Sequence, residues 1–179
     1  SEGEFMLKTA EKLGELLMRH GLISEEQLVK ALEVQRGTTR RIGEVLVELG
    51  LTTELDIASS LSRQLGIPYA SASSGLLSPK KGEGLERLVS EEFARQHLVL
   101  SLSRTMNSLT IACVNPLDLI TMDNLSRLSH CEINPVVTTK GDLEQAIDRF
   151  YGGDALLRKA IGDSYEAIEV SDAPSDGDE

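Results

Sequence analysis

A tandem repeat near the start of the chain limits its fold more than any other feature. The 24 residues Lys12–Gln35, KLGELLMRHGLISEEQLVKALEVQ, align without a gap with Arg41–Gln64, RIGEVLVELGLTTELDIASSLSRQ, at an offset of 29. Eight of the 24 aligned positions are identical, which chance does not produce. Repeats of this size are supersecondary units that bury their apolar faces against each other. The first sixty-odd residues are therefore predicted to be one unit used twice.

Each copy has the pattern of two helices separated by a glycine. In the first copy, apolar residues recur at helical spacing up to Gly21, a residue typical of the position just after a helix. Ser24, with Gln27 three residues later, forms a capping box that predicts the start of the next helix, and Gly37 can end that helix. The corresponding residues of the second copy are Gly50, Thr53 and Gly66. Two such hairpins predict a four-helix subdomain.

After the repeat, the apolar pattern changes from helical to strand-like. A loop rich in Ser, Gly and Pro over residues 67–82 precedes a short helix capped by Ser90. Two strand-like runs, HLVLSLS and LTIACV, are joined through Thr105–Asn107 and predict a hairpin. Asn115 and Pro116 predict the start of a further helix that runs to about residue 129.

A third strand is predicted in EINPVVTT, at the edge of the sheet because Pro135 cannot donate a ladder hydrogen bond. The helix DLEQAIDRFY follows and is expected to end at Gly152 and Gly153. The fold class is therefore α+β: a four-helix subdomain built from tandem helical hairpins, then a small, three-layer-like α/β subdomain with a short sheet. The expected segments are a cloning remnant (1–5), the helical subdomain (6–66), a linker loop (67–82), the α/β subdomain (83–153) and an acidic, largely disordered tail (154–179) with a short helix at 155–161.

Charge and hydropathy exclude several function classes. The net charge of −11 is concentrated in the tail, which carries −6, while residues 6–153 carry only −3. A body so close to neutrality argues against DNA or RNA as a partner, because nucleic-acid binding needs a basic surface. No apolar run approaches the roughly 20 residues that span a bilayer. We therefore predict a cytoplasmic protein without a membrane span.

No pattern for catalysis or metal binding is present in the sequence. The chain lacks GxxxxGK[ST], GxGxxG after a strand, GxSxG and HExxH, so it is not predicted to be an enzyme. Cys113 and Cys131 lie in apolar runs without CxxC spacing and are expected to be buried free thiols. The three histidines are scattered without a ligand pattern, so no metal or cofactor is predicted.

The repeat holds one unusual chemical feature, a glutamine that ends the apolar stripe of each copy. Gln35 follows Leu28 and Leu32 on one helical face, and Gln64 follows its own stripe at the same phase. A Gln amide offers donors and an acceptor suited to the edge of a base. A single such Gln is more often a solvated helix end, but repetition in phase is not required by packing. A two-fold ligand and a purely structural role therefore stay as alternatives.

Each copy also begins with a cation and a glycine. Lys12 and Arg41 are expected at exposed helix starts, and an Arg can bind guanine O6 and N7 or stack on the ring. Gly14 and Gly43 have no side chain, so their backbone N–H groups could approach a phosphate. A cation with an aliphatic neighbour is otherwise an ordinary surface residue.

These residues resemble a known family. The repeated pattern, and the later segment from SEEFARQHLVLSLS to DLEQAIDRFYG, are similar to the MshE-type N-terminal domain of the ATPases of type II secretion and type IV pilus assembly. Some members of that family bind cyclic di-GMP. By position, the resemblance implies the ligand-binding residues Lys12, Leu13, Gly14, Leu28, Leu32, Gln35, Arg41, Ile42, Gly43, Ile57, Leu61 and Gln64.

Two positions depart from the family pattern. Lys12 replaces an Arg, which keeps the charge but loses the planar fork, and Thr52 replaces an aliphatic residue. The resemblance implies a regulatory domain that senses cyclic di-GMP for the ATPase core of a longer parent protein. The alternative is a docking domain that binds an inner-membrane secretion or pilus platform protein without nucleotide. Either would place the protein at the inner face of the inner membrane.

Overall fold

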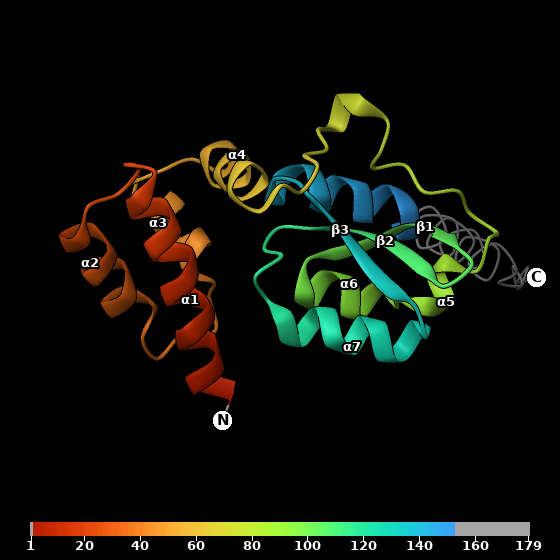
Figure 1. Cartoon of the computed structure of the whole chain (residues 1–179), viewed down its shortest axis with the longest axis horizontal. Helices are drawn as coiled ribbons and strands as arrows, with labels where there is room; N and C mark the ends of the chain where they lie inside the picture. The colour runs from red at the N-terminus through yellow and green to blue at the C-terminus, as the bar shows by residue number, and fades with distance from the viewer. Residues whose placement is uncertain (1, 153–179) are drawn as a thin grey trace, which may run out of the picture.

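The computed structural model describes residues 2–152 and gives the predicted α+β fold (Figure 1). A helical subdomain contains α1 to α4, and an α/β subdomain contains the sheet β1 to β3. The predicted acidic tail, its helix at 155–161 and the second glycine expected to end the last helix lie outside the described residues. No helix within residues 2–152 is both long and apolar enough to cross a membrane.

The four N-terminal helices follow the tandem repeat. In the first copy α1 covers Glu2–Arg19 and α2 covers Glu25–Gln35; in the second, α3 covers Ile42–Glu48 and α4 covers Glu54–Leu65. The glycines predicted to end these helices all adopt the left-handed conformation that favours a residue without a Cβ, namely Gly21, Gly37, Gly50 and Gly66.

The predicted capping box is confirmed. The amide of Gln27 donates to Oγ of Ser24 at 3.2 Å, and the amide of Ser24 donates to Oε1 of Gln27 at 2.9 Å. In the second copy, Thr53 caps α4 by accepting the amide hydrogen of Asp56 at 3.1 Å. These bonds satisfy N–H groups that have no partner inside the helix, and they fix where α2 and α4 begin.

A hydrophobic core lies between the four helices. The equivalent leucines Leu17 and Leu46 are both completely buried in it. The α/β subdomain also contributes, because Val137 at the end of β3 is completely buried in this core. Val137 is tied to the chain between the subdomains: its amide donates to Pro68 O and its carbonyl accepts from the Ala70 amide, both at 2.9 Å. The two subdomains therefore share a core residue.

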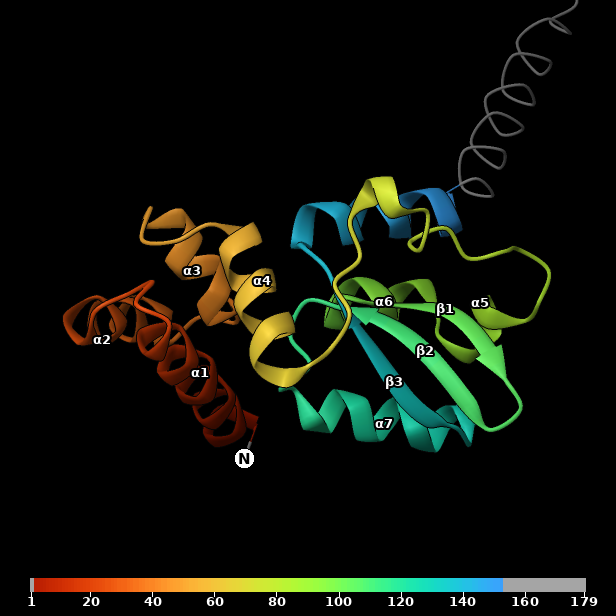
Figure 2. The same ribbon diagram turned by 45° about the horizontal axis from the view of Figure 1, so that its top comes forward.

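The sheet has the strand order β1-β2-β3. β1 (Val99–Thr105) and β2 (Ser108–Cys113) form the predicted antiparallel hairpin, and β3 (Glu132–Val137) pairs with β2 in parallel. β3 is an edge strand of this sheet, as its proline predicted. Figures 1 and 2 show α7 (Leu119–Ser129) on one face of the sheet and the helical residues 140–152 on the other. The predicted three-layer arrangement is confirmed.

The start of α7 differs from the prediction. Asn115 and Pro116 lie in a turn, in which Oδ1 of Asn115 accepts the amide hydrogen two residues on at 3.0 Å. Asp118 is the residue that caps α7, through the amide of Thr121 at 3.2 Å. Because the Asn115 side chain bonds within this turn and does not cap a helix, α7 begins three residues after Pro116.

The linker loop contains more structure than expected. Residues 72–74 form the short 3-10 helix η1, and Tyr69 forms an isolated parallel bridge with Val137. The single-turn helix α5 (Leu85–Leu88) was not predicted, because four residues carry no periodic signal. The predicted helix capped by Ser90 is α6 (Glu91–His97).

Candidate functional site

The two cations of the repeat occupy unequal positions. Arg41 is the N-cap of α3, as expected for a helix start. Lys12 is exposed but lies inside α1, which begins ten residues earlier at Glu2, so the expectation of a helix start is wrong there. The helix α1 continues through the residues that precede Lys12. The two copies therefore present their cations from different backbone environments.

The two glycines are likewise unequal. Gly43 is the second residue of α3, within the first turn, where N–H groups have no partner in the helix. Gly14 lies in the interior of α1, where amides serve the helix's own hydrogen bonds, so it does not offer the free N–H that was expected. Its role here is steric: a Cβ at Gly14 would lie 2.5 Å from Cδ1 of Leu28. Gly14 thus allows α1 and α2 to approach closely.

The apolar members of the predicted ligand set belong mainly to the helical core. All but one are buried, and Leu32 is half-buried against the same core. A Cβ at Gly43 would meet Cδ1 of Ile57 at 3.6 Å and Cδ2 of Leu13 at 3.8 Å, which brings residues of both copies together. The buried members are Leu13, Leu28, Ile42, Ile57 and Leu61. In this structure they stabilise the subdomain and have little surface free for a ligand.

Each glutamine of the repeat has a partner, but not an equivalent one. Gln35 is half-buried, and its Nε2 donates to Arg40 O at 3.0 Å, which holds the connection between α2 and α3. Gln64 is exposed, and its Oε1 lies 3.2 Å from Nε2 of His20, just after α1. The contact of Gln64 with His20 therefore joins the two copies, while the bond from Gln35 to Arg40 stabilises the segment between α2 and α3.

A polar hollow adjoins the His20–Gln64 contact. It has a volume of about 250 Å³ and lies between α4 and the turn after α1. His20, Asp56 and Arg63 line it together with three small or apolar residues. None of the twelve predicted ligand residues lines this hollow, although Gln64 reaches it through His20.

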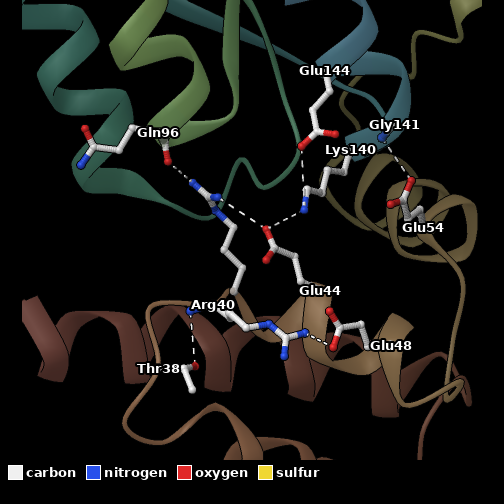
Figure 3. Close-up of polar contacts among 10 residues, drawn as sticks. Thr38, Arg40, Glu44, Glu48, Glu54, Gln96, Lys140, Gly141 and Glu144 are labelled. Carbon is white, nitrogen blue, oxygen red and sulfur yellow. Dashed lines mark hydrogen bonds and ion pairs between the residues drawn. The ribbon is translucent and has the colours of Figure 1, made fainter.

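Arg41 points its guanidinium at the α/β subdomain. Nη2 donates to the backbone carbonyl of Gln96 on α6 at 2.9 Å, and Nη1 lies 3.8 Å from Oε1 of Glu44. The same Glu44 oxygen accepts Nζ of Lys140 at 3.3 Å, so Glu44 lies between a cation of each subdomain (Figure 3). Among the described residues, no hydrogen bond or ion pair of Arg41 is made to another predicted ligand residue.

One histidine close to Arg41 has a perturbed pKa. The pKa of His97 is lowered from its ordinary value of 6.5, first by burial and also by the positive charge of Arg41, with Asp118 opposing. His97 stacks against Phe93, with ring centroids 4.3 Å apart. The C-terminal end of α6 is thus an environment that favours a neutral imidazole.

The sequence did not single out His20, Glu44, Gln96 or Lys140. Glu44 had a signal, since Glu15 and Glu44 are identical positions of the repeat. Gln96 and Lys140 had none, because they lie outside the repeat and contact it only after the subdomains pack together.

Comparisons with known proteins agree with this architecture. A relative, the type IV pilus assembly ATPase PilB of Myxococcus xanthus (strain DK1622), is 35% identical over 161 residues, which are 89% of this chain and 28% of PilB. The chain therefore spans little more than a quarter of that protein. The solved structure of MshE with cdg is 31% identical, with a TM-score of 0.61, and the match covers 78% of this chain and 98% of that one.

The N-terminal domain of XpsE shares the fold, with a TM-score of 0.66, 22% identity and coverage of 79% of this chain and 96% of that one. The family described as the MshEN domain matches residues 65–156 of this chain. The family match starts just after the tandem repeat. The two structural matches cover 78% and 79% of this chain. Because residues 65–179 make up less than two thirds of the chain, these structural matches must also include residues of the repeat. Because the MshEN family matches more than half of its length, this chain belongs to the MshEN domain family.

Proposed function

We propose that this chain is the regulatory N-terminal domain of a secretion or pilus-assembly ATPase and that it binds cyclic di-GMP through the two copies of its repeat. The observation that carries the proposal is the in-phase repetition of a cation, a glycine and a glutamine in a chain 31% identical to MshE, whose structure was solved with cdg. Two copies of one residue set suit a ligand made of two equal halves.

The polar members of the predicted set are the groups available to such a ligand. Lys12 and Gln64 are exposed, and Arg41 and Gln35 are half-buried. Arg41 offers two or more N–H donors to a guanine edge or a plane on which a base can stack. The apolar members other than Leu32 are buried, so their contribution to binding requires the helices to turn these side chains toward the ligand.

The parent protein and its partners follow from the relatives. PilB is described as an ATPase, and this chain corresponds to a small part of its length. We therefore propose that catalysis takes place in a separate core of a longer parent protein. This domain would regulate that core according to whether cyclic di-GMP is bound. An inner-membrane platform protein is the further partner that the resemblance implies, and it would hold the parent at the inner face of the membrane.

Calorimetric titration of the chain with cyclic di-GMP tests the proposal. We expect one ligand per chain, and far weaker binding of ATP, because a linear nucleotide cannot satisfy both copies. Arg41→Ala and Gln64→Ala should each weaken binding by about 1–3 kcal/mol, the worth of a good contact to a base edge. Absence of heat and of amide shifts at millimolar cyclic di-GMP would end the sensor proposal.

Arg63→Ala is the matched control for these variants. Arg63 is an exposed cation next to Gln64 on α4, yet it is not a member of the predicted set. Its loss should leave cyclic di-GMP affinity within about twofold of wild type, since exposed charges contribute little. A melting temperature that falls together with affinity in Arg41→Ala would assign Arg41 a structural role instead.

The docking alternative has one observation in its favour. Leu119, Ile120 and Leu128 on α7 are all about half exposed or more, at 56%, 47% and 58%. Exposed aliphatic side chains along one helix are common at protein interaction sites. Binding of a platform protein that is unaffected both by cyclic di-GMP and by Arg41→Ala, but lost with Ile120→Asp, would favour this alternative.

A further inference from the structure

Two types of contact join the subdomains. One is apolar and consists of Val137 in the helical core, with the linker residues 68–70 beside it. The other is polar and lies on the second copy of the repeat. Arg41 donates to Gln96 O at 2.9 Å, Glu44 accepts Lys140 at 3.3 Å, and Glu54 accepts the amide of Gly141 at 3.2 Å (Figure 3). We call these three contacts the polar joint.

The polar joint uses residues that both copies possess. Glu15 and Glu44 are equivalent positions of the repeat, and so are Glu25 and Glu54. In the second copy both glutamates are half-buried and contact the α/β subdomain. In the first copy both are exposed, and within residues 2–152 neither makes an ion pair or hydrogen bond with that subdomain. The same sequence motif therefore has an additional role in one copy only.

Arg41 belongs to both the polar joint and the predicted ligand set. Each bidentate edge of a guanidinium includes at least one Nη atom, and both Nη atoms of Arg41 already have a partner. Turning this head group to a guanine would lengthen its bond to Gln96 O. The carbonyl of Gln96 lies at the end of α6, so the change would reach the α/β subdomain directly.

We infer that the polar joint is a latch that competes with cyclic di-GMP for Arg41, so that ligand binding at the second copy loosens the contact between the subdomains. This inference rests on the proposed function. Under this inference, ligand binding first moves the guanidinium of Arg41. That movement weakens the contact of Arg41 with Gln96, and the neighbouring contact of Glu44 with Lys140 weakens with it. The two copies are then unequal, because the first copy binds without opening any joint.

The repeat supplies a matched test. We compare the double variant Glu44→Gln/Glu54→Gln with Glu15→Gln/Glu25→Gln, which makes the same charge change at the equivalent positions of the first copy. This variant weakens two of the three contacts of the latch, because a neutral Gln attracts Lys140 and the Gly141 amide less strongly than a carboxylate does. It should therefore tighten cyclic di-GMP binding by about three- to tenfold. The first-copy variant should stay within about twofold of wild type.

Amide NMR signals report the latch without relying on affinity. The His97 amide adjoins the Gln96 carbonyl, and the Gly141 amide donates to Glu54. Both signals should move when cyclic di-GMP is added to the wild-type chain. In the ligand-free variant Glu44→Gln/Glu54→Gln they should already lie part of the way to the bound position, as expected for a shifted equilibrium.

The outcomes separate the two proposals. If cyclic di-GMP binds while the His97 and Gly141 signals stay fixed, the latch is wrong and the proposed function stands. The latch is equally wrong if the two double variants bind with the same affinity. If the wild-type chain does not bind cyclic di-GMP at all, the proposed function and the latch fail together.

Discussion

Replacing Gly14 by alanine would test the packing role that the structure gives to this glycine of the repeat. A Cβ at Gly14 would lie 2.5 and 2.7 Å from the two Cδ atoms of Leu28 and 3.2 Å from its Cγ, all too close. Leu28 is buried, so its side chain would have to shift inside the helical core. At Gly43 the nearest atom to a new Cβ is 3.6 Å away, an ordinary contact. Equivalent glycines therefore predict opposite effects.

The magnitude follows from two opposing contributions. Alanine in place of glycine inside a helix stabilises it by up to about 1 kcal/mol, and an extra methyl group in a tight core costs about 1–3 kcal/mol. Gly14→Ala carries both contributions, whereas Gly43→Ala carries only the first. We expect Gly14→Ala to be the less stable of the two by about 1–3 kcal/mol. For a chain of this size, each kcal/mol lowers the melting temperature by roughly 2–4 °C.

Urea denaturation followed by circular dichroism would measure both variants. A double-mutant cycle with Leu28→Ala supplies the control, because removing the Cδ atoms should abolish the penalty of Gly14→Ala. Equal stability of Gly14→Ala and Gly43→Ala would refute the steric role of Gly14. So would an unchanged penalty in the Leu28→Ala background, since the clash would then have another source.

Three further predictions follow from the same structure. Lys12→Arg should tighten cyclic di-GMP binding by up to about 1–2 kcal/mol and Arg41→Lys should weaken it, both measured by calorimetry; no gain from Lys12→Arg would contradict a contact between residue 12 and the ligand. Burial and the charge of Arg41 lower the pKa of His97 from 6.5, so between the two pKa values the unfolded chain binds more protons at this residue than the folded chain does. The free energy of unfolding should therefore decrease as the pH falls below about 6.5. The decrease should be smaller in His97→Gln than in the wild-type chain. Burial raises the pKa of Cys113 to about 12, so iodoacetamide at pH 8 should modify this thiol only after unfolding, and rapid labelling of the native chain would contradict its burial.

The elements with strong local signals were predictable. The helix ends at Gly21 and Gly50 and the cap at Ser24 depend on residues within one turn, so the sequence alone fixed them. The hairpin between β1 and β2 and the edge position of Pro135 likewise depend on neighbouring residues. The start of α7 was misplaced because Asn115 and Asp118 are both good capping residues, and the turn at Asn115 used the first.

The candidate site was predictable only as a set of positions. Repetition identified Arg41 and Gln64, but their actual partners, Gln96 and His20, lie 55 and 44 residues away in the sequence. Such contacts depend on how α3 and α4 pack on the rest of the chain, for which no local pattern exists. The extension of α1 ahead of Lys12 lies outside the repeated unit, so the repeat carries no signal for it.

The burial of Val137 in the helical core has a consequence for cooperativity. A fragment starting at residue 65, where the family match begins, would expose Val137 and uncover the half-buried Leu117 and Tyr69, which pack against the same core. Burial of one valine side chain contributes about 1.5–3 kcal/mol, a large share of the stability of so small a fragment. The two halves should therefore unfold in one transition, and the helical and α/β subdomains are best expressed together.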